Sequence, residues 1–255
     1  MTIEREGKFF VDHDLKGRLS IGMDSRKLSV CVAEAIRRRA YGVFGNPEYH
    51  FKETNLDFLK DLPRIQKIWF FDINLKNVDG IYPLKQLKEF GVHPKRPPIK
   101  FELLPTLEFA EWQYKDGDSG MATLKSLKDL GLAHYNPKSA SFEGLELPPN
   151  LVELGIAWVN PRTLAGLPKL IHLKKLVIGR CRNLETLKDL PIIAPNLQRL
   201  EIESCGRLAD VEQVIRRLPK LRKAFLDEKV LLDLPELPPT AVRHRSRKGD
   251  KDKSN

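Results

Sequence analysis

Two pairs of side chains in this chain could carry out chemistry, one of histidines and one of carboxylates. His93 and His134 could bind a metal ion, and both face the same side of the sheet predicted below. They fall two strands apart, roughly 10 Å at about 4.8 Å per strand. Zinc ligands all lie about 2 Å from one ion. We therefore expect no metal site and no cofactor.

The carboxylates Glu108 and Asp129 are predicted on adjacent strands, offset by two residues. That offset gives a separation of roughly 8 Å, which an inverting glycosidase could use. A flat sheet face, however, offers little desolvation to shift their pKa values. The chain also lacks the sequences G-x-x-x-x-G-K-[ST], G-x-S-x-G and C-x-x-C. The prediction is a protein without catalytic activity.

An internal repeat must position these residues. The pattern L-x-x-L-x-L-x-x-C occurs closely twice, from Leu173 to Cys181 and from Leu197 to Cys205. Looser copies begin at Ile65, Leu87, Leu104, Leu127, Leu151 and Leu221, and an eroded first copy would use Tyr41, Val43 and Asn46. The eight first positions recur at intervals of about 17 to 24 residues. Apolar residues spaced three and then two apart, with a proline between most copies, favour short strands over helices.

These units resemble leucine-rich repeats, with Cys181 and Cys205 typical of the cysteine-containing class. The segments 183–187 and 234–238 resemble bacterial cytoplasmic leucine-rich repeat proteins. The resemblance implies an α/β fold: a curved solenoid with a parallel concave sheet of about eight strands and an irregular or short-helical convex side. It also implies a role in binding protein. Irregular turns are expected at Ile73, Trp112, Tyr135 and Val159, which stand where asparagine or cysteine is usual.

The ends of the chain are predicted to differ from the repeats. Residues 1–37 would form an N-terminal cap, with short strands at 9–11 and 19–21 and a helix that begins near Asp24 or Ser25. The alternation in residues 27–32 leaves a strand possible there. The repeats would fill residues 38–235, with residues 231–235 closing the core. Residues 236–255 would be a disordered basic tail.

The repeat pattern also predicts which side chains leave the concave face. In the middle strands these include small residues at Gly131, Ala133, Gly155, Ala157 and Gly179, which would let a partner approach the backbone. Tryptophan and arginine, frequent anchors of protein interfaces, stand beside this floor. The predicted partner-binding residues are Trp69, Phe71, His93, Glu108, Glu111, His134, Trp158 and Arg180.

Charge and cysteine content decide between the remaining classes of function. No apolar run is long enough to cross a membrane, and three scattered cysteines indicate a reducing cytoplasm rather than a disulfide framework. We expect a monomeric cytoplasmic module that binds another protein, as a scaffold or as a bacterial inhibitor or immunity protein. The net charge of +10 leaves a nucleic-acid-associated protein as the alternative. Acidic side chains on the predicted concave face argue against it.

Overall fold

The computed structural model describes residues 2–235, which form an α/β structure built on one open sheet of 13 strands. The sheet runs in sequence order from one end to the other. Its strands are β1 (Ile3–Glu6), β2 (Phe9–His13), β3 (Leu19–Gly22), β4 (Gly42–Gly45), β5 (Lys67–Asn74), β6 (Glu89–Lys95), β7 (Phe109–Gln113), β8 (Asp129–Ala133), β9 (Glu153–Ala157), β10 (Lys175–Gly179), β11 (Arg199–Glu203), β12 (Lys223–Leu226) and β13 (Lys229–Asp233).

Helices are few and short, because the segments that return from one strand to the next contain prolines and tight turns. The α-helices are α1 (Leu28–Arg37), α2 (Leu190–Ile193) and α3 (Val211–Ile215). The 3₁₀ helices are η1 (Ser25–Lys27), η2 (Pro47–Tyr49), η3 (Asp57–Asp61), η4 (Asp79–Ile81), η5 (Phe101–Leu103) and η6 (Met121–Thr123). Among residues 2–235, no helix combines the length and the apolar character needed to cross a bilayer.

The sheet is larger than predicted and mixed rather than parallel. Strands β3 to β12 are parallel, whereas β1–β2, β2–β3 and β12–β13 pair antiparallel. The prediction of about eight parallel strands was therefore wrong, since it counted only the repeats. Antiparallel strands at both ends cover the backbone groups that the outermost parallel strands would leave unpaired.

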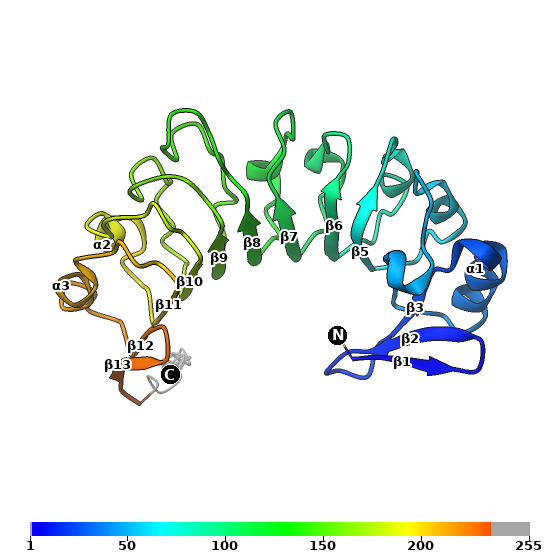
Figure 1. Ribbon diagram of the computed structural model, residues 1–255, viewed down its shortest axis with the longest axis horizontal. Coiled ribbons are helices and arrows are strands. Elements are labelled where there is room, and N and C mark those ends of the chain that lie inside the picture. The colour runs from blue at the N-terminus through cyan, green and yellow to red at the C-terminus, as the bar shows by residue number, and fades with distance from the viewer. Residues whose placement is uncertain (1, 236–255) are drawn as a thin grey trace, which may run out of the picture.

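The strands line the inner side of an arch, and the loops and short helices lie along its outer side (Figure 1). On the central strands β7 to β10, residues alternate between half-buried and fully buried. The buried ones point into the core between the strands and the outer loops. The half-buried residues, which are the first, third and fifth of each of these strands, form the surface on the inner side of the arch. We call this surface the inner face.

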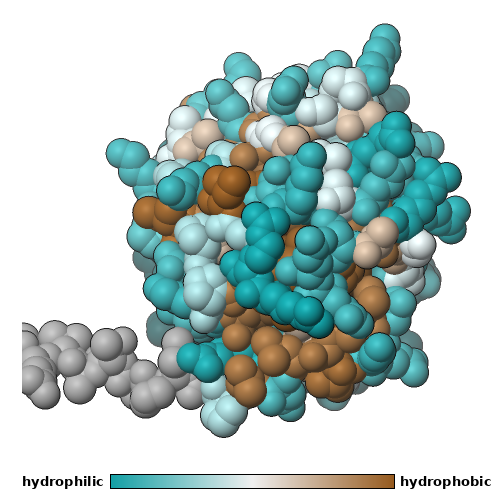
Figure 2. All heavy atoms as spheres, turned by 90° about the vertical axis from the view of Figure 1, so that its left-hand side faces the viewer, coloured by the Kyte–Doolittle hydropathy of each residue, from teal (hydrophilic) through white to brown (hydrophobic). Residues whose placement is uncertain are grey.

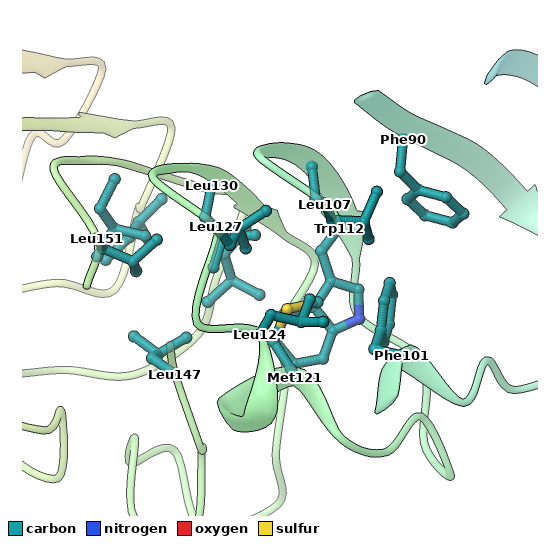
Figure 3. Close-up of a cluster of buried hydrophobic side chains, with 14 of the residues drawn as sticks. Phe90, Phe101, Leu107, Trp112, Met121, Leu124, Leu127, Leu130, Leu147 and Leu151 are labelled. Atoms are coloured by element: carbon teal, nitrogen blue, oxygen red, sulfur yellow. The ribbon is translucent and has the colours of Figure 1, made fainter. Parts of the chain in front are cut away.

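Stacked rows of apolar side chains make the core. Leu130 on β8 lies in register with Leu154 on β9, which is in register with Leu176 on β10. All three are at most 2% exposed. Near β7, the core continues through Phe101, Trp112 and Met121 toward the outer loops (Figure 3). No unit could bury these side chains alone, so each depends on its neighbours.

The structure corrects the repeat frame at β7. Leu104 was predicted as the first position of its copy, but Ala110 pairs with Leu130 and Trp112 pairs with Leu132. Leu107 is therefore the first position, and the neighbouring intervals become about 20 residues each. In the corrected frame Phe109 lies on the inner face rather than in the core, and Ala110 lies in the core, where it is fully buried.

Trp112 was expected at an irregular turn but lies within β7 and is 4% exposed. Its indole N–H donates to Asp118 Oδ2 at 2.8 Å. Asp118 also forms two 2.7 Å bonds with the guanidinium of Arg96, and the side chains of that pair are 0% and 1% exposed. Backbone amides of Ile99 and Lys115 donate to the same carboxylate. This buried ion pair fixes the loop that follows β7.

The turns at Cys181 and Cys205 are formed as predicted for buried turn residues. Both cysteines are free and buried. Their thiols lie 3.3 Å from the carbonyl oxygens of Gly179 and Glu203, respectively. They also reach the strand of the preceding unit, at Ile156 O and Ile178 O, each 3.7 Å away. A small side chain is required where these turns pack on one another.

The N-terminal end contains the predicted strands and the helix, so the alternative strand at 27–32 is wrong. Asp24 caps the 3₁₀ turn before α1 by accepting from Arg26 N–H. Cys31, Val32 and Ala35 of α1 are buried, whereas Ile36 is 56% exposed.

At the other end, Leu231 and Leu232 of β13 pack on the core, whereas Val230 is exposed. Hydrophobic atoms gather on the lower part of this end of the molecule (Figure 2). The predicted tail, residues 236–255, lies outside the described residues.

Replacement of Asp118 by alanine should lower the free energy of unfolding by about 3–5 kcal/mol, because Arg96 would remain buried without its counterion. Urea unfolding followed by circular dichroism measures this loss. The control is Asp57→Ala, which removes an exposed ion pair with Lys60 and should cost less than about 1 kcal/mol. Equal losses in the two variants would contradict a structural role for the buried pair.

Candidate binding face

A row of three stacked side chains, His134, Trp158 and Arg180, follows the ends of β8, β9 and β10. The rings of His134 and Trp158 are nearly parallel, at 8°, with centroids 5.4 Å apart. The guanidinium carbon of Arg180 lies 5.1 Å from the centre of the Trp158 ring. Residues about 22–24 positions apart in the chain thus make one continuous surface. This stacked row brings together three of the predicted site residues.

One backbone arrangement places all three side chains. Each residue has a left-handed backbone, with φ of 59°, 53° and 56°. Each amide turns toward the next strand, where His134 N–H donates to Ala157 O, Trp158 N–H to Gly179 O and Arg180 N–H to Glu203 O. The residue that follows each of β8, β9 and β10 therefore takes the same conformation.

Trp158 occupies this position at an energetic cost. A left-handed backbone disfavours residues with a Cβ atom by about 1–2 kcal/mol, and histidine or serine tolerates it better than a bulky aromatic. The equivalent residue of the unit after β11 is Ser204, with φ of 53°. Trp158 is nevertheless 46% exposed and is not part of the buried core. Strain of this kind is concentrated at functional sites.

A second cluster lies at the N-terminal end of the inner face. Trp69 and Phe71 of β5 have ring centroids 5.1 Å apart, and Phe71 meets His93 of β6 edge-on at 4.5 Å. The ring of Trp69 lies over Gly91 and reaches Phe109 on β7, 5.8 Å away. Trp69, Phe71 and Phe109 line a groove of about 600 Å³ that we call the aromatic groove. Burial lowers the pKa of His93, which favours its neutral form.

Carboxylates and small residues occupy the middle of the inner face. Gly131 and Gly155 are in register, and Ala133 and Ala157 beside them. The carboxylate of Glu111 extends over Gly131. Burial, together with Asp129, raises the pKa of Glu111. Burial and the neighbouring Glu153 raise the pKa of Asp129 to about 6.

Two sequence-based predictions about these acids were wrong. Glu108 was placed on the strand, but it precedes β7, is exposed and pairs with Lys88 at 2.8 Å. Phe109, not Glu108, is in register with Asp129. The flat face was also expected to leave carboxylate pKa values unchanged, whereas the curved, half-buried face raises that of Asp129.

The two histidines stand apart on the inner face. His93 is on β6 and His134 follows β8, with β7 between them. Within residues 2–235, no group of three or more histidine, cysteine or acidic side chains has the geometry to hold a metal ion.

Sequence reasoning missed Phe109 and Lys67 as residues of the inner face. Phe109 was hidden by the misplaced frame, whose irregular interval of about 17 residues was the available signal. Lys67 stands at the third position of its copy, which points onto the inner face, and lines the aromatic groove.

The chain was also compared with known proteins. No model of a known protein family matches it, and no curated protein does.

Gly91→Ala should displace Trp69, because a Cβ atom at residue 91 would lie 2.5 Å from the indole ring. We expect a loss of about 1–3 kcal/mol in unfolding free energy and a changed NMR shift of the Trp69 indole. Gly155→Ala is the matched control, since its Cβ would meet nothing closer than 3.8 Å. An unchanged Trp69 signal in Gly91→Ala would contradict the described packing.

Asp129→Asn should stabilise the protein at pH 8 by about 1 kcal/mol, a value reduced for solvent screening. The folded pKa of about 6 exceeds the usual 3.8, so the native state holds more protons between these values. Wild-type stability therefore falls as pH rises through this range, and the advantage of the variant should shrink toward pH 4. Urea unfolding across pH measures the effect, with Glu108→Gln as control. A pH-independent difference would contradict the raised pKa.

Proposed function

We propose that the chain is a leucine-rich repeat protein, a curved solenoid, and that it binds another protein with the inner face of its arch and performs no catalysis. The in-register parallel strands, the rows of buried leucines and the cysteines at two turns support this family assignment. The inner face would then be the concave surface of the solenoid. A scaffold and an inhibitor would use such a surface in the same way.

The stacked row carries the proposal. Trp158 is large, half exposed and held in an unfavourable backbone conformation, and folding alone gives no reason for tryptophan there. Stacking between His134 and Arg180 orders its ring before a partner arrives, which reduces the entropy lost on binding. Tryptophan and arginine are also the residues most enriched among those that dominate binding energy.

The floor beside the row supports close approach. Gly179 has open space where a side chain would stand, and a Cβ atom at Gly155 would meet nothing closer than 3.8 Å. A partner could therefore contact the backbone of β9 and β10 while its side chains pack on Trp158. The carboxylates of Glu111, Asp129 and Glu153 lie on the same face, which disfavours a nucleic-acid backbone as the ligand.

The double variant Trp158→Ala/Arg180→Ala should bind the partner with an affinity lower by about 30-fold or more. The partner is first isolated from the native host on immobilised wild-type protein. Surface plasmon resonance with that partner measures the loss. Urea unfolding should show a fold at least as stable as the control. That control, Ile192→Ala, removes an exposed apolar side chain from α2 on the outer side. Affinity within threefold of wild type would contradict the proposed site.

A further inference from the structure

The aromatic groove contains a largely buried lysine whose only charged partner within the described residues is distant. Lys67 lines the groove with Phe44, Trp69, Phe71 and Phe109, yet the residue is only 7% exposed. An ammonium group buried this far is costly unless hydrogen bonds replace those of water. The partners of Lys67 therefore decide what the groove can bind.

Neither nearby acid accepts a hydrogen bond from the Lys67 ammonium. Glu89, its in-register neighbour on β6, accepts hydrogen bonds from Arg18 at 2.7 Å and from the hydroxyl of Tyr41 at 2.9 Å. Asp12 lies 3.6 Å from the ammonium, beyond hydrogen-bond distance. Its Oδ2 atom is buried and has no hydrogen-bond partner within the described residues.

The Lys67 ammonium therefore has hydrogen bonds to offer at the wall of an apolar groove. Within residues 2–235, the structure gives the ammonium no hydrogen bond, only the long ion pair with Asp12. A ligand that brings an acceptor atom into the groove would supply the missing bond. Hydrogen bonds to charged groups are stronger than those between neutral groups.

The surrounding charges select a neutral acceptor. Asp12, Asp14 and Glu89 lie in this cluster with Lys67 and Arg18. The acids already outnumber the bases, so another carboxylate would meet repulsion, while a cation would meet Lys67. Every residue of a protein carries a neutral carbonyl. The rings of Trp69, Phe71 and Phe109 favour an aromatic neighbour.

We infer that the aromatic groove binds an aromatic side chain of the partner protein, whose own main-chain carbonyl accepts a hydrogen bond from Lys67. The inference rests on the proposed function and adds a second anchor point on the same face. The partner ring packs against Trp69 and Phe109, and its carbonyl lies beside the ammonium. The stacked row binds a different part of the partner.

Model compounds test this without the partner. The probe is N-acetyl-phenylalanine N-methylamide, which carries one ring and neutral carbonyls, and the control is N-acetyl-alanine N-methylamide. Titrations are followed by NMR of the Trp69 indole and the ε-methylene of Lys67 in the full chain. We expect saturable shifts with the phenylalanine amide in the millimolar range, as suits a fragment of this size, and at least about tenfold weaker binding of the alanine amide.

Variants separate this site from the stacked row. Lys67→Met should weaken the phenylalanine amide about tenfold, and Asp12→Asn/Lys67→Met should give the same loss without leaving Asp12 as an unpaired buried charge. Trp158→Ala should bind the probe as wild type does. If the folded double variant binds the probe normally, the role of Lys67 is wrong.

Two further outcomes would also overturn the inference. One is equal binding of the phenylalanine and alanine amides. The other is tighter binding of N-acetyl-phenylalanine with a free carboxylate, because an anionic ligand would then be preferred. In either case, loss of partner binding in Trp158→Ala/Arg180→Ala would still support the proposed function. Failure of the groove inference and failure of the proposed function are therefore distinguishable.

Discussion

The structure depends on the in-register stacking of parallel strands from β3 to β12. A single unit exposes its leucines, and only the units before and after it can remove them from water. Because Leu130, Leu154 and Leu176 pair position by position, each unit must repeat the spacing of its neighbours. Loops between the strands vary in length, but the buried positions of β7 to β11 stay in register.

The same register creates the inner face. Side chains at equivalent positions of adjacent strands lie about 5 Å apart, so side chains from separate units contact one another directly. His134, Trp158 and Arg180 form one stack for this reason, and Trp69 can lie over Gly91 to reach Phe109. Register also brings Asp129 beside Glu153 on a half-buried surface, where burial and the Glu153 carboxylate disfavour ionisation of Asp129.

The periodic part of the fold was predictable from sequence, because apolar spacing directly reports which residues face the core. The stacked row followed from the same spacing. The misplaced frame at Leu104 shows the limit: Leu104 and Leu107 are both buried leucines, and only the pairing of Ala110 with Leu130 distinguishes them.

Several features built by segments outside the repeat were not predictable. The short strand at 9–11 was predicted, but the end strands β1 and β13 follow no template. The burial of Lys67 depends on Asp12, and the pairing of Glu89 depends on Arg18, both from the first 20 residues. The ion pair between Arg96 and Asp118 joins loop residues 22 positions apart with no regular spacing. Contacts of this kind become visible only in three dimensions.

The proposed function requires that a protein partner covers the inner face. Hydroxyl-radical footprinting of the chain with and without its partner tests this most directly, because the half-exposed Trp158 reacts readily in the free protein. We expect a several-fold drop in oxidation at Trp158 and Trp69 when the partner is bound. Oxidation of exposed residues on the outer side, such as Ile192, should stay unchanged. Protection of the outer side with Trp158 still fully reactive would contradict it.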